Sequence, residues 1–168
     1  DIMMGEGAVW ENVSREMLEV PAVPLKDIPL HIRKIWGIDF GIGHPFAAVL
    51  MLHDADTDIA TVVHEIKISD SVPDKHVLMM RPIAPDVPVA WPGTDGTNRE
   101  KSSGIELHKY YKDSPARLGV NMRPVHAMFP TGGYATHEGI TEILTRMQTG
   151  RFQVASNWYA AKNSQGGT

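Results

Sequence analysis

The chain has no cysteine among its 168 residues. Disulfide bonds and zinc sites built on thiolates are therefore excluded. It also lacks an apolar run of the roughly 18 residues that a membrane-spanning helix needs, since its longest apolar segment, residues 46–52, is followed by His53 and Asp54. The start of the sequence is acidic and has no cleavable apolar core of a signal peptide. These absences fit a cytoplasmic protein that does not enter a membrane.

Several catalytic motifs are missing as well. Without a Gly-Lys-Ser/Thr phosphate-binding loop, this segment is not expected to hydrolyse ATP. The pairs His64-Glu65 and His137-Glu138 both lack the second histidine, four positions on, that a zinc-protease helix requires. The glycines of segment 41–43 have no third glycine after them, which argues against a dinucleotide site. Zinc-protease, dinucleotide-dependent and ATPase chemistry are thus disfavoured.

An excess of positive charge is also absent. There are 16 Lys and Arg residues against 20 Asp and Glu residues, a formal net charge of −4. DNA-binding surfaces normally cluster basic side chains against the phosphates. Metal-dependent nucleases are acidic at their active sites, however, because carboxylates hold the cations that reverse the local field. The charge balance therefore does not exclude a nuclease.

Hydrophobic residues make up 42% of the chain and charged residues 21%, the composition of one ordinary globular domain. Residues 1–33, with three spaced prolines, are expected to be a lead-in rather than part of the domain. Three strands are predicted next, at 35–40, 46–52 and 59–68. The short connections between them favour an antiparallel meander.

The second half of the chain is expected to alternate helices and strands. The predicted helices cover residues 73–81, 98–111 and 137–149, and the predicted strands cover 87–91, 120–127 and 152–155. The last helix carries an apolar stripe and is followed by Gly150, a residue suited to end it. This order predicts an α/β domain with an RNase H-like fold. Its central mixed sheet, an antiparallel meander followed by parallel strands, would be flanked by helices.

Two acidic residues stand at the ends of predicted buried strands. Asp39 closes the apolar segment 35–40, and Asp95 follows the segment 87–91. A carboxylate in such a place is costly to bury unless it is paired or binds a metal. A structural interpretation is also open for both, because Asp next to Gly is an ordinary turn signal. If one sheet brings the two strand ends together, the carboxylates can hold two divalent cations about 3.5–4 Å apart.

The segments around these acids resemble those of a known family. Ile35-Trp36-Gly37-Ile38-Asp39-Phe40-Gly41 is similar to the first catalytic strand of tailed-phage large terminase subunits. Val87-Pro88-Val89-Ala90-Trp91-Pro92, with Asp95-Gly96 after it, is similar to their second. The segment Arg146-Met147-Gln148-Thr149-Gly150-Arg151-Phe152 resembles a later helix-to-strand part of the nuclease domain. Gly5-Glu6-Gly7 resembles the link that follows the family's ATPase domain.

The resemblance implies an endonuclease that cuts concatemeric double-stranded viral DNA during genome packaging. Asp39 and Asp95 would be catalytic ligands of a two-metal Mg²⁺ or Mn²⁺ site. It also implies a portal protein and a small terminase subunit as partners, and a location at the procapsid in the host cytoplasm. Residues 1–33 would lead in from an ATPase domain, and residues 34–168 would form the nuclease domain. The family's third acid, on a C-terminal catalytic helix, has no counterpart before Thr168.

Four further residues are weaker candidates. Glu65, on the third predicted strand, and His44, close to Asp39 in sequence, are possible metal ligands. Each also has an ordinary interpretation, as a strand residue facing solvent or a surface-loop histidine. Arg99 and Lys101 begin the predicted helix after Asp95, where they would contact DNA phosphates or form a solvated helix face.

Two other functions remain open at this stage. The segment 37–41 also resembles the first phosphate-binding loop of actin-like ATPases, which share the RNase H-like core. A catalytically silent docking domain of the packaging motor would use Asp39 and Asp95 only structurally. The nuclease and actin-like interpretations both predict divalent-cation binding at paired acids, whereas the docking interpretation predicts none.

Overall fold

The fold was analysed in a computed structural model that describes residues 13–40, 45–69, 71–92, 109, 111, 122–125 and 136–156. Its helices are α1 (Arg15–Leu18), the 3-10 turn η1 (Leu25–Asp27), α2 (Pro73–Met80) and α4 (Thr136–Gln148). Its strands are β1 (Glu19–Val20), β2 (Arg33–Asp39), β3 (Phe46–Asp54), β4 (Ile59–Ile68), β5 (Val89–Pro92), β6 (Met122–Val125) and β7 (Phe152–Ala155).

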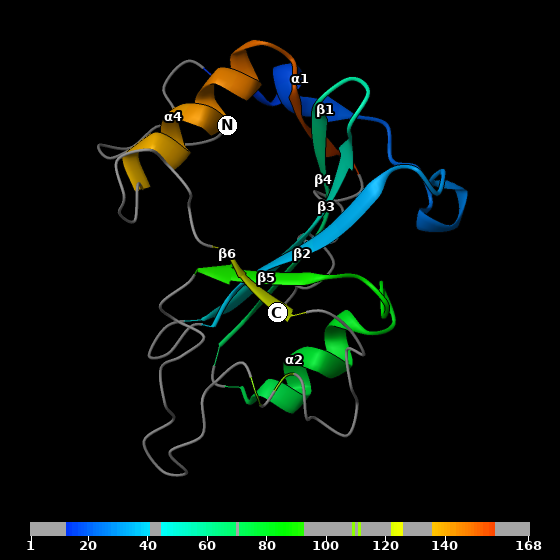
Figure 1. The fold of residues 1–168 in the computed structure, drawn as a ribbon, viewed down its shortest axis with the longest axis vertical. Helices are drawn as coiled ribbons and strands as arrows, with labels where there is room; N and C mark the ends of the chain where they lie inside the picture. The colour runs from blue at the N-terminus through cyan, green and yellow to red at the C-terminus, as the bar shows by residue number, and fades with distance from the viewer. Residues whose placement is uncertain are drawn as a thin grey trace, which may run out of the picture. The chain divides into compact units, whose positions relative to one another are not determined.

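Within these described ranges the strands form one seven-stranded sheet in the order β1-β7-β4-β3-β2-β5-β6. The connections from β2 to β3 and from β3 to β4 are shorter than the dozen or more residues that a parallel crossover needs, so these three strands form an antiparallel meander. The pairs β2–β5, β5–β6, β4–β7 and β1–β7 are parallel. The predicted mixed sheet is confirmed, and Figure 1 shows β5 between β2 and β6.

The chain divides into two compact units. The first contains residues 1–32, 53–63 and 127–168, and thus α1, β1, η1, the turn end of the β3–β4 hairpin, α4 and β7. Its buried apolar residues are Ala60, Val63, Met147, Val154 and Ala155. In this unit β1 pairs with β7, Glu19 with Val154 and Val20 with Ala155. Part of the segment expected to be a lead-in therefore contributes a strand to the sheet.

The end of helix α4 is set by a glycine in a left-handed conformation. Gly150 follows it with a φ of 70°, a left-handed conformation in which a side chain would be strained. The Gly150 N–H donates to the carbonyl of Met147 at 3.3 Å, and the Arg151 N–H donates to the carbonyl of Arg146 at 2.8 Å. These are the two hydrogen bonds of a Schellman motif. They close the helix and turn the chain directly into β7, as the sequence predicts.

The second unit contains residues 33–52 and 64–126, including β2, most of β3, the end of β4, α2, β5 and β6. Alternate residues of β3 are buried, namely Phe46, Ala48, Leu50 and Leu52. They share the core with residues of other elements of this unit: Trp36, Ile38, Val77, Met80, Val89, Trp91 and Tyr111. The Trp36 indole N–H donates to the carbonyl of Ala84 at 3.1 Å, which ties β2 to the turn after α2.

The predicted elements agree well with those described. The strands at 59–68 and 152–155 have the predicted bounds, and the bounds of the other predicted strands and of the helices at 73–81 and 137–149 differ by at most two residues. The predicted helix at 98–111 lies almost wholly outside the described residues, although Lys109 and Tyr111 are helical. Among the helices described, none is long and apolar enough to cross a membrane.

Candidate metal centre

Asp39 is the last residue of β2 and lies at the carboxyl end of the strand. Its neighbours Ile38 and Phe40 are buried, at 4% and 6% exposure, whereas Asp39 itself is exposed. Because side chains alternate between the two faces of a strand, Asp39 projects from the face opposite the core of this unit. A hydrophobic strand thus presents a carboxylate at the edge of the sheet without burying its charge.

Strand β5 runs parallel to β2, with Trp36 opposite Val89 and Gly37 opposite Ala90. The carboxyl ends of the two strands therefore lie at the same edge of the sheet. Continuing this register places Asp39 level with Pro92, the last residue of β5. Strand β6 is also parallel and ends at the same level, since Pro92 pairs with Val125. The carboxyl ends of three strands thus lie at the edge that carries Asp39.

Asp95 follows this edge in sequence, but it lies outside the described residues. The same holds for the weaker metal candidate His44 and for the DNA-contact candidates Arg99 and Lys101. Glu65 is described and is half-buried in β4. The structure therefore positions Asp39 at a shared strand end and leaves the other predicted site residues as predictions.

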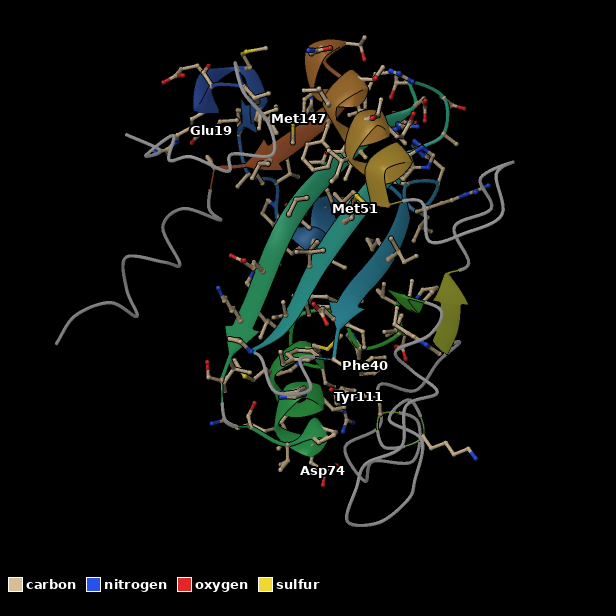
Figure 2. The ribbon with its side chains drawn as sticks, turned by 90° about the vertical axis from the view of Figure 1, so that its left-hand side faces the viewer. Glu19, Phe40, Met51, Asp74, Tyr111 and Met147 are labelled. Carbon is tan, nitrogen blue, oxygen red and sulfur yellow. The ribbon has the colours of Figure 1, made fainter. Side chains whose placement is uncertain are left out.

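Behind Asp39, on the core side of the sheet, aromatic rings connect the ends of these strands. The ring of Phe40 contacts Trp91 of β5 edge to face, with centroids 5.9 Å apart. It also packs against Tyr111 at 5.3 Å. Figure 2 shows Phe40 and Tyr111 close together beside α2. Aromatic contacts of this kind restrain ring positions. The end of β2 is therefore held to β5 through the side chain of the next residue, Phe40, as well as through backbone hydrogen bonds.

The same cluster contains a buried histidine. His76 of α2 is 3% exposed and stacks on Phe46, with ring centroids 3.8 Å apart and planes 9° apart. Its Nδ1 shares a hydrogen bond of 2.7 Å with the Tyr111 hydroxyl, and its Nε2 shares one of 2.6 Å with the Ser71 hydroxyl. Burial lowers the pKa of His76 to about 4, with a further contribution from the charge of Lys75. The imidazole is therefore neutral at pH 7, donating through one nitrogen and accepting through the other.

An exposed group that the sequence analysis did not single out has the donor chemistry of a cation site. The ligand atoms of His31, Asp54 and Asp56 all lie within 4.8 Å of one another at the β3–β4 turn. Asp54 is already used to fold that turn, because its carboxylate accepts from the Asp56 N–H at 3.0 Å and from the Thr57 hydroxyl at 2.9 Å. These hydrogen bonds lower the pKa of Asp54. Exposed turn acids often gather in this way, so the trio is not assigned as the catalytic centre.

A second charged group in the same unit serves the fold. Asp58 accepts hydrogen bonds from Arg146 at 3.1 and 3.2 Å and from Arg151 at 2.8 Å, and it shares one of 3.0 Å with His53. These partners hold the pKa of Asp58 well below its usual range. Arg146 is also bonded to Glu142 at 2.7 Å. Arg151 is thus engaged in an ion pair with Asp58.

Solved structures of other proteins share the fold of this chain. The chain superposes on the nuclease domain of the P22 large terminase with a TM-score of 0.74 and 31% identity, covering 95% of this chain and 78% of that one. It also matches the human cytomegalovirus terminase nuclease domain, in a manganese-soaked crystal, at a TM-score of 0.54 and 9% identity, covering 87% and 75%. At that identity the likeness concerns the fold alone. The fold is thus that of terminase nuclease domains, an RNase H-like fold.

Curated sequences agree with the structural match. The chain is 33% identical over 145 residues to the terminase large subunit of Enterobacteria phage LP7, covering 84% of this chain and 30% of that protein. No protein-family model matches the chain. The chain belongs to the family of phage terminase large-subunit nuclease domains, as its sequence motifs predict. The actin-like alternative therefore does not apply.

Proposed function

We propose that this chain is a divalent-metal-dependent endonuclease that cuts concatemeric double-stranded viral DNA during genome packaging. The observation that carries the proposal is the exposed carboxylate of Asp39 at the end of β2, beside the parallel end of β5, in a domain of this family. A sheet edge reached by several parallel strand ends allows acids from separate segments to converge. Asp95, three residues after β5 in sequence, is the second ligand in this proposal.

The available donors fit a hard cation. Carboxylate oxygens are the ligands that Mg²⁺ and Mn²⁺ prefer, and the Asp39 residue is exposed to solvent. When bound, such a metal pair activates water and stabilises the leaving oxygen of a phosphodiester. The role of the chain is to hold its carboxylates in register. Glu65 and His44 stay secondary candidates for the same cations, and Arg99 and Lys101 for contacts with the phosphates.

The remaining functions belong to a longer protein. The chain spans 30% of the length of the phage LP7 relative and 28% of that of phage P22. In this proposal residues 34–168 form the nuclease domain, and residues 1–33, whose strand β1 pairs with β7 of that domain, connect it to an ATPase domain. A third acid stands on a C-terminal helix. The partners are DNA, the portal protein and the small terminase subunit, and the site of action is the procapsid in the host cytoplasm.

Cleavage of supercoiled plasmid in Mn²⁺ tests the proposal. Asp39→Asn and Asp95→Asn each remove one ligand charge while keeping side-chain size. Both are expected to lower the nicking rate by roughly a hundredfold, because even residues that only orient a ligand are often worth ten- to hundredfold. Circular dichroism checks that each variant is folded.

Asp56→Asn is the matched control, since it changes an exposed acid of the His31–Asp54–Asp56 trio. It should cut at the rate of the unmodified chain. If activity is lost with Asp56→Asn and retained with Asp39→Asn, the metal centre is the turn trio and the assignment of Asp39 is wrong. If all the proteins are equally inactive and none binds Mn²⁺, the docking interpretation replaces the nuclease.

A further inference from the structure

The buried side of the sheet behind Asp39 contains a polar connection that the proposed chemistry does not use directly. Ser71, His76 and the Tyr111 hydroxyl form a continuous hydrogen-bonded chain, with distances of 2.6 and 2.7 Å. Tyr111 is 1% exposed, and burial raises the pKa of its hydroxyl. Burying polar groups costs free energy unless they are paired, so ring arrangements that keep both hydrogen bonds are favoured.

The hydrogen-bonded rings of His76 and Tyr111 contact aromatic residues at the ends of the strands beside Asp39. Tyr111 packs on Phe40 at 5.3 Å and on Phe46 at 6.1 Å, and Phe40 contacts Trp91 at 5.9 Å. Phe40 immediately follows Asp39, and Phe46 begins β3. We call Phe40, Phe46, His76, Trp91 and Tyr111 the aromatic cluster. It joins the end of β2, the end of β5 and the start of β3 to helix α2.

Stacking alone would hold these rings loosely. Rings can slide and tilt over one another at small energetic cost, whereas a buried hydrogen bond fixes both distance and direction. His76 is fixed from both sides, by Ser71 and by Tyr111, while it stacks on Phe46 with planes 9° apart. The hydrogen bond from His76 thus restrains Tyr111, whose ring packs on Phe40.

We propose that the His76–Tyr111 hydrogen bond is a positioning device for the metal centre, fixing the Asp39-bearing end of β2 through the ring of Phe40. This inference rests on the proposed function, because it assigns Asp39 as a metal ligand. Two-metal hydrolysis requires ligands held within fractions of an ångström. Loosening the aromatic cluster then weakens metal binding more than it changes the chemistry after the metal has bound.

The test is Mn²⁺ binding, followed by electron paramagnetic resonance of the free ion, together with the Mn²⁺ dependence of plasmid nicking. Tyr111→Phe removes only the hydroxyl and keeps the ring. It is expected to weaken Mn²⁺ binding by about tenfold, the lower end of the effect of groups that orient a metal ligand. The nicking rate at saturating Mn²⁺ should change by less than about threefold.

Two further variants separate positioning from general loss of stability. Val154→Ala shortens a residue of β7 that is 6% exposed and lies in the other unit, so it destabilises the domain without touching the aromatic cluster. Its Mn²⁺ affinity should be unchanged. Phe40→Leu keeps most of the apolar volume but removes the ring that contacts Tyr111, so it should weaken Mn²⁺ binding in the same way. It also tests the inference if Tyr111→Phe does not fold.

The outcomes distinguish this inference from the proposed function. If Asp39→Asn abolishes Mn²⁺ binding but folded Tyr111→Phe and Phe40→Leu bind as the unmodified chain does, the positioning inference is wrong and the metal centre stands. If Val154→Ala weakens binding as much as Tyr111→Phe, the effect is one of stability and the inference is again wrong. If Asp39→Asn also binds Mn²⁺ normally, the proposed function itself fails.

Discussion

The aromatic cluster and the Asp58 cluster both join segments that are distant in sequence, but they use different chemistry. We define the Asp58 cluster as His53, Asp58, Glu142, Arg146 and Arg151. The side chain of Asp58 is 44% exposed and that of Arg151 is 34% exposed, whereas His76 and Tyr111 are almost completely buried. Water and salt therefore reach the Asp58 cluster and weaken its electrostatics, but they do not reach the aromatic cluster.

This difference separates two structural tasks. The Asp58 cluster fastens the β3–β4 turn to the junction of α4 and β7, a connection that can tolerate small movements. The aromatic cluster lies directly behind Asp39, where a small movement changes the position of a proposed ligand. Apolar packing with a fully paired buried hydrogen bond provides rigidity there, while a partly solvated ion pair would provide less.

The largest expected difference between the two clusters is in stability. Phe46 is 2% exposed and carries the stack on His76, so Phe46→Ala leaves a cavity and an unsupported imidazole. It should lower the free energy of unfolding by about 3–5 kcal/mol, measured by urea denaturation. Met17→Ala, at a position that is 49% exposed, is the control and should change it by less than about 0.5 kcal/mol. Similar effects of the two substitutions would show that the aromatic cluster is not tightly packed.

The next effect concerns pH. The pKa of His76 in the folded chain is about 4, below the value of about 6.5 expected in the unfolded chain. The folded state thus favours the neutral imidazole, so its stabilisation is complete above pH 6.5 and is lost as the pH falls towards 4. The expected loss across this window is about 2–3 kcal/mol. Burial also lowers the pKa of His64, which adds a smaller loss in the same direction.

His76→Gln isolates the contribution of His76. This variant should be less stable at pH 7 but should lose much less stability than the unmodified chain between pH 6.5 and 4. Urea denaturation at several pH values gives both slopes. Equal slopes would mean that His76 is not held neutral by burial, and the contrast between the two clusters would disappear.

The smallest expected effect is at Asp58. Its φ of 54° is tolerated by asparagine, so Asp58→Asn removes the charge without straining the turn. The melting temperature at pH 7 should fall by roughly 2–4 °C, and by less in 1 M NaCl because salt screens partly exposed pairs. Asp56→Asn, in the same turn, should leave it unchanged. A fall that is independent of salt would contradict the description of this cluster as solvated.

Acid should remove the same stabilisation. The partners of Asp58 hold its pKa below the ordinary value of about 4. The stabilisation is therefore present above pH 4 and is lost as the pH falls below 4. The stabilisation that depends on His76 is lost earlier, between pH 6.5 and 4. In Asp58→Asn this portion of the acid-induced loss should be absent, as thermal melts between pH 4 and 2 would show.

The sequence predicts much of this fold because its signals are local. The apolar and polar pattern of β4, and the glycine after α4, depend on neighbouring residues and give nearly correct bounds. The pairing of β1 with β7 was not predicted, since Glu19 and Val154 are far apart in the chain and two residues carry no periodicity. The sequence also gives no sign that the residues before the first of the three spaced prolines form a strand of the sheet.

The candidate centre was predictable only in part, for the same reason. Asp39 stands out because a carboxylate at the end of an apolar strand is unusual and because the surrounding motif resembles a known family. His76 and Tyr111 looked like ordinary residues of two predicted helices, and only the fold brings them together. The trio at the β3–β4 turn likewise depends on His31, which lies on a separate segment.

The central claim, that Asp39 holds a divalent cation, is tested most directly by soaking crystals of this chain in Mn²⁺ and calculating an anomalous difference map. We predict a manganese peak at about 2.0–2.3 Å from a carboxylate oxygen of Asp39, a normal distance for a cation of this size. The same peak should be absent from Asp39→Asn crystals. A map with its strongest peak at His31, Asp54 and Asp56, and none at Asp39, would contradict the account.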